Sequence, residues 1–305
     1  METREWFSYL KKYTARECDR FSCLYSWLNE LKLTKFKVTS IELKDSRFLQ
    51  ISPLGGAKPL GPKKIFVAHY DRRPESPAAN DNSAAVIELL LFLKSLDNQK
   101  DPPWLEVLFT DKEEITHDAS LQKQGSFIFG NYLKSQHQEH LISFHFDMCG
   151  RGDTVILSTA AEGLLKRRQR VKSPIYQQIQ RLKTLVLDSL RWHFRGRLML
   201  LLTPFSDNLG FLLQGIPSLH FCLLPFKEVY AYQRAYEALV KEVSASSSLS
   251  SKAKEDFQKR FQAIQPETWK LRHTAQDDLS SLSPESLKIM ESLLEALVRV
   301  RLPNL

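Results

Sequence analysis

The chain has 305 residues, 43% of them hydrophobic and 26% charged, a composition typical of a globular protein rather than a disordered or membrane-spanning one. The formal net charge is +8, but basic residues are spread along the chain, and the densest run, 166–172, is interpreted as a solvated face. Because no aromatic-rich basic motif accompanies this charge, we expect no nucleic-acid partner.

The N-terminal part of the chain predicts helix followed by a pair of strands. In residues 3–31, aromatic and aliphatic side chains recur mostly at spacings of three, four and seven, which predicts a helix broken once. Short alternating runs at 35–43 and 47–53 predict two paired strands.

Short apolar runs without clean alternation then alternate with helical segments. Such runs are typical of strands buried on both faces of a mostly parallel sheet, and they occupy 63–69, 105–110, 141–147, 153–159, 198–205 and 216–224. Helices are predicted at 82–96, 172–192 and 283–302. This alternation predicts an α/β fold in which helices flank both faces of a mixed, mostly parallel central sheet.

Residues 226–268 depart from the alternation. Two polar amphipathic stretches flank a Ser-rich run there, which predicts a small helical hairpin inserted late in the fold.

Cysteine usage and the N-terminal segment bear on the cellular compartment. The chain has four cysteines and no CxxC pair, so we expect reduced thiols rather than a disulfide framework. The N-terminal 20 residues carry charges throughout, unlike a secretory signal, and no uncharged apolar run is long enough to span a membrane. These features predict a cytoplasmic protein that does not associate with membranes.

Acidic and imidazole side chains follow several of the predicted strands. In open α/β sheets the carboxyl ends of the strands form the ligand-binding edge, so we expect these side chains to converge there. Gathering several carboxylates without a cation would cost several kcal/mol for each unpaired charge, which predicts divalent metal ions. Imidazole and carboxylate ligands together favour zinc. The residues are His69, Asp71, Asp81, Glu113, Glu114, Asp147 and His273.

These residues lie in an ordered series of motifs that resembles the zinc aminopeptidases of peptidase family M28. The series extends from about residue 60 to the C-terminus, and its order is more specific than any one motif. It consists of H-x-D at 69–71, A-N-D-N-x-A at 79–84, E-E at 113–114, F-D-M-x-G at 146–150, S-D-x-x-x-F-x-x-x-G-I-P at 206–217 and H-T-x-x-D at 273–277.

The resemblance implies metal-assisted hydrolysis that removes N-terminal residues from peptides. It implies that Glu113 is the general base for a water molecule activated by zinc, and that Asp71 orients His69. It also implies a single catalytic domain, 1–305, with the 226–268 hairpin near the rim of the active site. The implied metal ligands are His69 and Asp147 on one zinc ion, Glu114 and His273 on the other, and Asp81 bridging the two.

Three other functions bear comparison with the aminopeptidase, and one of them does not fit the size of the hairpin. Glutaminyl cyclases share this fold and use one zinc ion, and their final motif resembles IPSLHFCLLPF and WKLRHTAQDD in this chain, whereas A-N-D-N and FDMCG favour the peptidase. Di-zinc carboxypeptidases and deacylases share H-x-D and E-E, but they carry a large dimerisation domain that the hairpin is too small to match. A non-catalytic binding protein on the same fold is the third alternative, although this chain keeps all six expected groups.

The chain also departs from the family pattern. Asn208 follows Ser206-Asp207 where family members often have histidine, and extra residues separate Glu114 from Gly125. Asp207 is interpreted as either a helix cap or a substrate contact. His220 is interpreted as a core residue, and His145 as either a core residue or a neighbour of the site.

Overall fold

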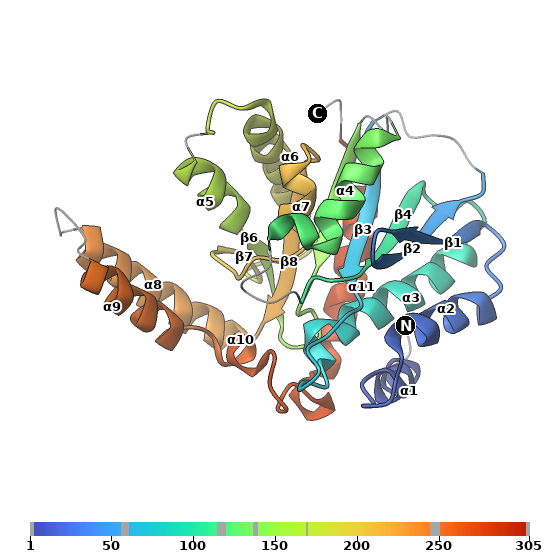
Figure 1. The fold of residues 1–305 in the computed structure, drawn as a ribbon, viewed down its shortest axis with the longest axis horizontal. Coiled ribbons are helices and arrows are strands. Elements are labelled where there is room, and N and C mark those ends of the chain that lie inside the picture. The colour runs from blue at the N-terminus through green and yellow to red at the C-terminus, as the bar shows by residue number, and fades with distance from the viewer. Residues whose placement is uncertain are drawn as a thin grey trace.

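Eight strands form a single sheet in the part of the chain that this computed structural model describes, which is residues 3–55, 61–114, 120–136, 140–168, 170–244 and 251–302 (Figure 1). The strands are β1 (Phe36–Leu43), β2 (Ser46–Pro53), β3 (Lys63–His69), β4 (Leu105–Thr110), β5 (Leu141–Phe146), β6 (Thr154–Ser158), β7 (Leu198–Leu201) and β8 (Ser218–Leu224). Their order across the sheet is β1-β2-β4-β3-β5-β8-β6-β7.

The centre of the sheet is parallel and its flanks are antiparallel. Strands β4, β3, β5 and β8 run in the same direction, so their carboxyl ends lie at one edge. At one flank β2 pairs antiparallel with β4 and with β1, and at the other flank β6 pairs antiparallel with β8 and parallel with β7. The predicted mixed α/β fold is confirmed.

Helices cover both faces of the sheet, as predicted. They are α1 (Thr3–Tyr13), α2 (Arg20–Glu30), α3 (Ala84–Asp97), α4 (Gly125–Ser135), α5 (Ala160–Arg167), α6 (Pro174–Leu190), α7 (Asn208–Leu213), α8 (Phe226–Ser244), α9 (Ser251–Ala263), α10 (Glu267–Leu271) and α11 (Pro284–Arg299). Alternate residues of β3 pack into two different cores, because successive side chains of a strand point to opposite faces. Phe66 and Ala68 join the core that contains α3 and α11, whereas Ile65 and Val67 join the core that contains α4 and α7.

The hairpin predicted at 226–268 is present as α8 and α9, which lie side by side and project away from the sheet (Figure 1). Its Ser-rich turn, 245–250, lies outside the described residues. Val229 and Tyr232 of α8 share an apolar cluster with Trp269 of α10, with Cys222 of β8 and with Met148, which lies just after β5. The base of the hairpin is therefore attached beside the carboxyl end of β5.

The elements differ in several details from the sequence-based expectation, and helices α4 and α5 were not among the predicted ones. The strand expected at 198–205 ends at Leu201, and the chain then leaves the sheet through Pro204, which cannot donate a ladder hydrogen bond. Helices α7 and α10 are too short to produce a helical repeat of apolar residues. None of the described helices combines the length and the apolar character that crossing a bilayer requires.

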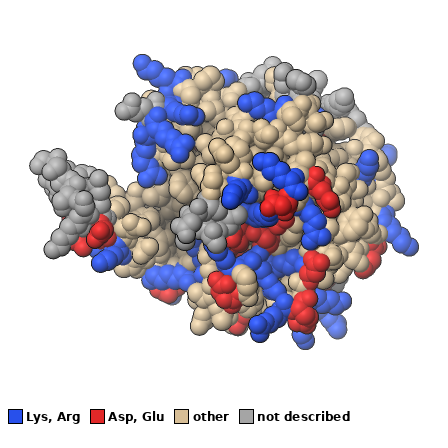
Figure 2. All heavy atoms as spheres, in the orientation of Figure 1, with Lys and Arg blue, Asp and Glu red and all other residues tan. Residues whose placement is uncertain are grey.

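The charge distribution is consistent with the sequence pattern. On the face drawn in Figure 2, lysine and arginine side chains occupy several separate areas, and acidic side chains lie among them. Basic charge is thus distributed over this face rather than collected in one continuous patch.

Candidate metal centre

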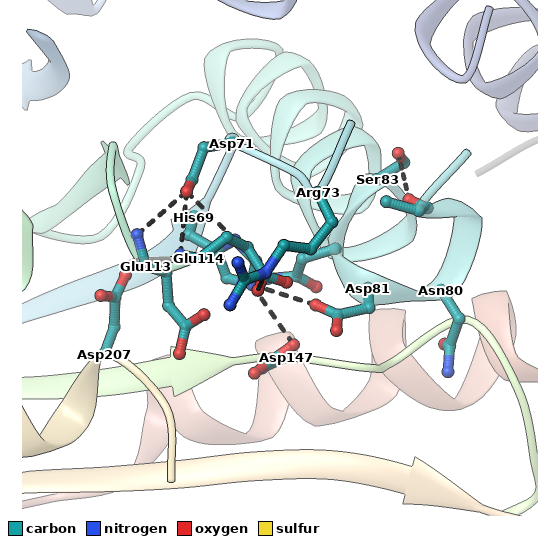
Figure 3. Close-up of polar contacts among 12 residues, drawn as sticks. His69, Asp71, Arg73, Asn80, Asp81, Ser83, Glu113, Glu114, Asp147 and Asp207 are labelled. Atoms are coloured by element: carbon teal, nitrogen blue, oxygen red, sulfur yellow. Dashed lines mark hydrogen bonds and ion pairs between the residues drawn. The ribbon is translucent and has the colours of Figure 1, made fainter. Parts of the chain in front are cut away.

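The expected site residues meet at the carboxyl edge of the sheet because three neighbouring parallel strands end there. His69 is the last residue of β3, Asp147 follows β5, and Glu113 and Glu114 follow β4 (Figure 3). Asp81 comes from a single irregular helical turn, Ala79–Ser83, that precedes α3. His273 lies in the loop after α10 and reaches the same edge.

We call His69, Asp81 and Asp147 the inner triad. Nε2 of His69 lies 3.3 Å from Oδ1 of Asp81 and 3.5 Å from Oδ1 of Asp147. One ligand-type atom from each of the three lies within 4.8 Å of the others. The His69 side chain is 1% exposed and both carboxylates are buried.

We call Asp81, Glu114 and His273 the outer triad. Nε2 of His273 lies 3.4 Å from Oδ2 of Asp81 and 2.9 Å from Oε2 of Glu114. The His273 side chain is 32% exposed, whereas that of Glu114 is 4% exposed. Asp81 is common to both triads and directs a different carboxylate oxygen toward the histidine of each.

Asp71 connects the end of β3 to the segment that carries the two glutamates. Its Oδ1 lies 3.4 Å from Nδ1 of His69, which is the contact that its expected orienting role requires. The same carboxylate accepts hydrogen bonds from the backbone N–H of Glu113 (3.1 Å) and of Glu114 (2.9 Å). One carboxylate therefore positions the imidazole and both glutamates together.

The turn that carries Asp81 is held by a residue almost 200 positions away. The Asp277 carboxylate accepts hydrogen bonds from the backbone N–H of Asn80 (2.8 Å) and of Asp81 (3.0 Å). Asp277 is buried, and burial raises its pKa to about 6. The sequence contained a signal for this contact, because Asp277 is the last residue of the H-T-x-x-D motif.

The two asparagines that flank Asp81 tie its turn to the end of β5. Nδ2 of Asn82 donates a hydrogen bond to the backbone carbonyl of Phe146 (2.8 Å). Oδ1 of Asn80 accepts one from the backbone N–H of Gly150 (2.8 Å). Because Asp147 lies between these two contacts, the asparagines fix Asp81 relative to Asp147.

Arg20 was not identified from the sequence. It lies at the start of α2, is 5% exposed, and donates hydrogen bonds to the loop that connects His69 to Asp81. No metal-site motif includes it, and its buried position depends on how the N-terminal helices pack. Its acceptors are the carbonyls of Tyr70 (3.2 Å), Asp71 (3.4 Å), Pro77 (2.8 Å) and Ala78 (3.3 Å) and Oγ of Ser83 (2.6 Å).

Left-handed backbone conformations occur beside the site. Positive φ angles are found at Ala78 (53°), Lys112 (54°), Met148 (54°) and His273 (61°). Each of these residues is part of a segment that carries an expected metal-binding or catalytic side chain. Non-glycine residues rarely adopt this conformation, and they cluster at functional sites where surrounding contacts enforce it.

The pKa shifts show that the cluster needs positive charge. Burial lowers the pKa of His69, but the carboxylates of Asp147, Asp71 and Asp81 together raise it well above its ordinary value. Hydrogen bonds to Asp81 and Glu114 raise the pKa of His273 to about 9. Without another cation, both imidazoles therefore hold protons to balance the carboxylates.

The pKa values of the two glutamates are both raised above that of an exposed glutamate in water. Burial raises the pKa of Glu113 well above its ordinary value, and the charges of Glu114 and Asp147 raise it further. Burial also raises the pKa of Glu114, although the hydrogen bond with His273 opposes this. A divalent cation would favour the ionised carboxylates and replace the protons on the imidazoles.

The residues fit a zinc centre. Nε2 of His69 and Oδ1 of Asp147 are buried and lie 3.5 Å apart, and neither makes a hydrogen bond with the described residues. Buried polar atoms normally have partners, so these atoms are available to bind a ligand. Two imidazoles with three carboxylates form the type of donor set that zinc prefers.

Asp207 and Arg73 border this cluster. The Asp207 carboxylate accepts a hydrogen bond from Oγ1 of Thr110, it makes no side-chain capping contact with α7, and burial raises its pKa to about 6. Figure 3 shows it beside Glu113. Nε of Arg73 lies 3.2 Å from Oε2 of Glu114, the same oxygen that contacts His273. Neither arrangement was evident from the sequence.

Two other histidines belong to the core. His145 is buried, contacts Oγ of Ser143 through Nε2 (2.8 Å), and packs edge-on against Phe211. His220 is also buried, and its Nδ1 lies 3.4 Å from Oγ1 of Thr203. For both residues the core interpretation is confirmed.

Comparison with known proteins adds independent evidence. The sequence model described as peptidase family M28 matches residues 55–298. No curated protein sequence matches the chain significantly.

Several solved structures share the fold. The LapA aminopeptidase of Legionella pneumophila is 14% identical, with a TM-score of 0.66 over 99% of this chain and 73% of its own. A glutaminyl cyclase of Porphyromonas gingivalis is 14% identical, with a TM-score of 0.61 over 98% of this chain and 97% of its own. A Zn-dependent exopeptidase of Parabacteroides distasonis is 15% identical, with a TM-score of 0.61 over 98% of each chain.

Proposed function

Because the chain belongs to peptidase family M28, we propose that it is a zinc-dependent aminopeptidase that removes N-terminal residues from peptides. Family membership by itself supports a metal-dependent, peptidase-type enzyme. The aminopeptidase assignment, and the treatment of residues 1–305 as one catalytic domain, are parts of the proposal.

The position of Asp81 is the observation that carries the proposal. Its two oxygens face two different histidines, each accompanied by a further carboxylate. This is the arrangement expected of a carboxylate that bridges two cations about 3.5–4 Å apart. His69 and Asp147 would hold one ion, and Glu114 and His273 the other.

Zinc bound there would supply a Lewis acid that polarises the scissile carbonyl and lowers the pKa of a water molecule to about 7. Glu113 accepts a proton from the attacking water and delivers it to the leaving amine. Burial raises the pKa of this carboxyl group, and the positive charge of bound zinc would favour the ionised form that a base requires. Asp71 keeps Glu113 in place through its backbone N–H and directs the His69 imidazole into the centre.

Replacing Glu113 by glutamine tests this assignment. We expect Glu113→Gln to retain zinc, measured by elemental analysis, and to lose about 10³-fold or more in the hydrolysis of aminoacyl-anilides, since general-base catalysis contributes about 10²–10⁴-fold. Glu42→Gln, at an exposed position of the edge strand β1, makes the same change away from the site and should cleave normally. Loss of zinc in Glu113→Gln would instead identify Glu113 as a metal ligand, and normal activity would remove it from the mechanism.

A glutaminyl cyclase remains the second candidate, because IPSLHFCLLPF resembles the cyclase motif and a cyclase shares the fold. The two candidates differ in metal stoichiometry and in product. A peptide with N-terminal glutamine distinguishes them in the presence of zinc, since release of free glutamine supports the aminopeptidase. Formation of pyroglutamate by a protein that holds one zinc ion would support the cyclase.

A further inference from the structure

A groove of about 400 Å³ lies between the hairpin and the segment that leads to Asp207. Its size is within the range of small-ligand sites. One wall is formed by α9 and the residues after it, and the other by the segment between β7 and α7. The lining residues are Thr203, Pro204, Gln258, Phe261, Gln262, Gln265, Trp269, Lys270 and Arg272.

Both walls of this groove continue into the candidate metal centre. Arg272 immediately precedes His273, and Pro204 lies three residues before Asp207. Trp269 belongs to the same apolar cluster as Met148, the residue after Asp147. A peptide whose scissile bond is at the centre therefore has this groove as a neighbouring space.

The charges that line the groove are all positive. Lys270 and Arg272 contribute two cations, and no aspartate or glutamate among the described residues lines it. Nζ of Lys270 is 2.7 Å from Oε1 of Glu267, so this charge is already balanced. Arg272 is half-buried and has no hydrogen bond or ion pair with any residue that the structure describes.

A neighbouring groove shows that this pattern is not general on the surface. Between α5 and α8, Lys166 and Arg167 line a cavity together with Glu162 and Glu237, so cations and anions balance there. In the groove beside the centre, none of the described lining residues is an aspartate or glutamate that could balance the charge of Arg272.

We propose that the groove binds a carboxylate of the peptide substrate through Arg272. The planar guanidinium of arginine matches a carboxylate with two parallel hydrogen bonds, and such charge-assisted pairs are among the stronger ones in proteins. Phe261 and Pro204, which are both partly exposed, provide apolar surface for the methylene groups that carry the carboxylate. This inference rests on the proposed function and adds a substrate class to it: peptides with an acidic first residue, or short peptides whose C-terminal carboxylate reaches the groove.

Two matched pairs of substrates test whether the carboxylate comes from the side chain of the first residue or from the C-terminus of a short peptide. Glutamyl- and glutaminyl-anilide differ only in the side-chain charge, and Leu-Gly and Leu-glycinamide differ only in the C-terminal charge. We expect kcat/KM to be about tenfold or more higher for the charged member of one pair, since a hydrogen bond to a charged group contributes about 1.5–3 kcal/mol. Equal values within both pairs would overturn the proposal.

Substitutions at Arg272 test whether this residue causes the preference. In the substrate pair that shows a preference, we expect Arg272→Gln to make kcat/KM equal for the charged and the uncharged member. Arg272→Lys should retain part of the difference. Arg260→Gln is the matched control, because Arg260 lies on the same hairpin, does not line the groove, and pairs with Glu242. A preference that survives in Arg272→Gln would contradict the assignment.

A binding measurement separates this inference from the proposed function. Calorimetry with the zinc-loaded full chain compares L-glutamate with L-glutamine, and Leu-Gly with Leu-glycinamide, without requiring turnover. Tighter binding of a charged member, lost in Arg272→Gln, supports the groove even if no peptide is cleaved. If anilides are cleaved but neither hydrolysis nor binding depends on the charge of the substrate, the result would support the aminopeptidase and reject carboxylate binding in the groove.

Discussion

The two triads that share Asp81 are built differently. The inner triad combines the last residue of one strand with the residue after a neighbouring parallel strand, and it is buried. The outer triad takes Glu114 and His273 from loops, exposes about a third of the His273 side chain, and shares a Glu114 oxygen with Arg73. Ligands held by a sheet are more rigidly positioned than ligands held by loops. We therefore expect the inner triad to bind zinc more tightly than the outer one.

The largest effect is expected from removing the residue that the triads share. Asp81→Ala should abolish binding at both positions and lower peptide hydrolysis by about 10³-fold or more. Metal ions contribute several kcal/mol to transition-state stabilisation, and each 1.36 kcal/mol corresponds to a factor of ten. Elemental analysis after zinc reconstitution provides the measurement, and Asp101→Ala, at an exposed position before β4, serves as the control. Retention of two zinc ions by Asp81→Ala would exclude a bridging role.

Removing one histidine at a time separates the triads. His69→Ala should lose the more tightly bound zinc ion, whereas His273→Ala should lose only the ion that a weak chelator already removes. We expect a difference of about tenfold or more in the zinc affinity that remains, measured by competition with a chromophoric chelator. Equal zinc affinities in the two variants would mean that the two triads bind zinc equally tightly.

The third effect concerns the residue that holds the loop between His69 and Asp81. Arg20→Ala removes a donor from five acceptors that are buried or partly buried, and it should destabilise the protein by about 3 kcal/mol, measured by chemical denaturation. Because Asp71 and Asp81 lie at the ends of this loop, zinc affinity should fall about tenfold as well. Arg16→Ala, at an exposed position near α2, is the control. Unchanged zinc affinity in a destabilised Arg20→Ala protein would limit Arg20 to a structural role.

Substitution of Arg73 should reduce the difference in zinc affinity between the two triads. Its guanidinium contacts the Glu114 oxygen that faces His273, so its charge opposes a cation in the outer triad. Arg73→Gln should strengthen zinc binding there by about three- to tenfold, because like charges at this separation repel. Zinc titration with the inner position already filled measures this. Weaker binding in Arg73→Gln would show that Arg73 supports Glu114 instead.

The smallest effect is the pH dependence of the metal-free protein. His273 has its pKa raised from 6.5 to about 9, so its protonated form contributes stability that is fully present below about pH 6.5 and lost as pH rises toward 9. Zinc affinity should rise over the same window, since zinc displaces this proton. Denaturation in excess chelator at pH 6.5 and pH 9 gives the comparison. Between these two pH values the free energy of unfolding should decrease less in His273→Asn than in the control His193→Asn, which changes an exposed histidine. Equal decreases in the two variants would contradict the assignment.

Much of the centre was predictable because parallel strands bring their carboxyl ends together. His69, Glu113, Glu114 and Asp147 each follow a recognisable apolar run, so their convergence follows from the sheet alone. The contacts of Arg20 and Arg73 were not predictable in this way. These side chains contact residues 41 to 63 positions away along the chain, and no periodic pattern indicates which loop an arginine will meet.

The sequence by itself determined the alternation of strands and helices, the motif order that identifies the family, and the chemical types of the candidate ligands. These follow from hydrophobic period and residue identity, which are local properties. Only the tertiary structure decided that Asp81 directs one oxygen toward each histidine and that Asp277 and Arg20 hold the loops in place. It also decided that Arg272 lines a groove in which the described residues include no acidic partner. These are distances between residues far apart in the chain, and they are set by how the helices and the hairpin pack around the edge of the sheet.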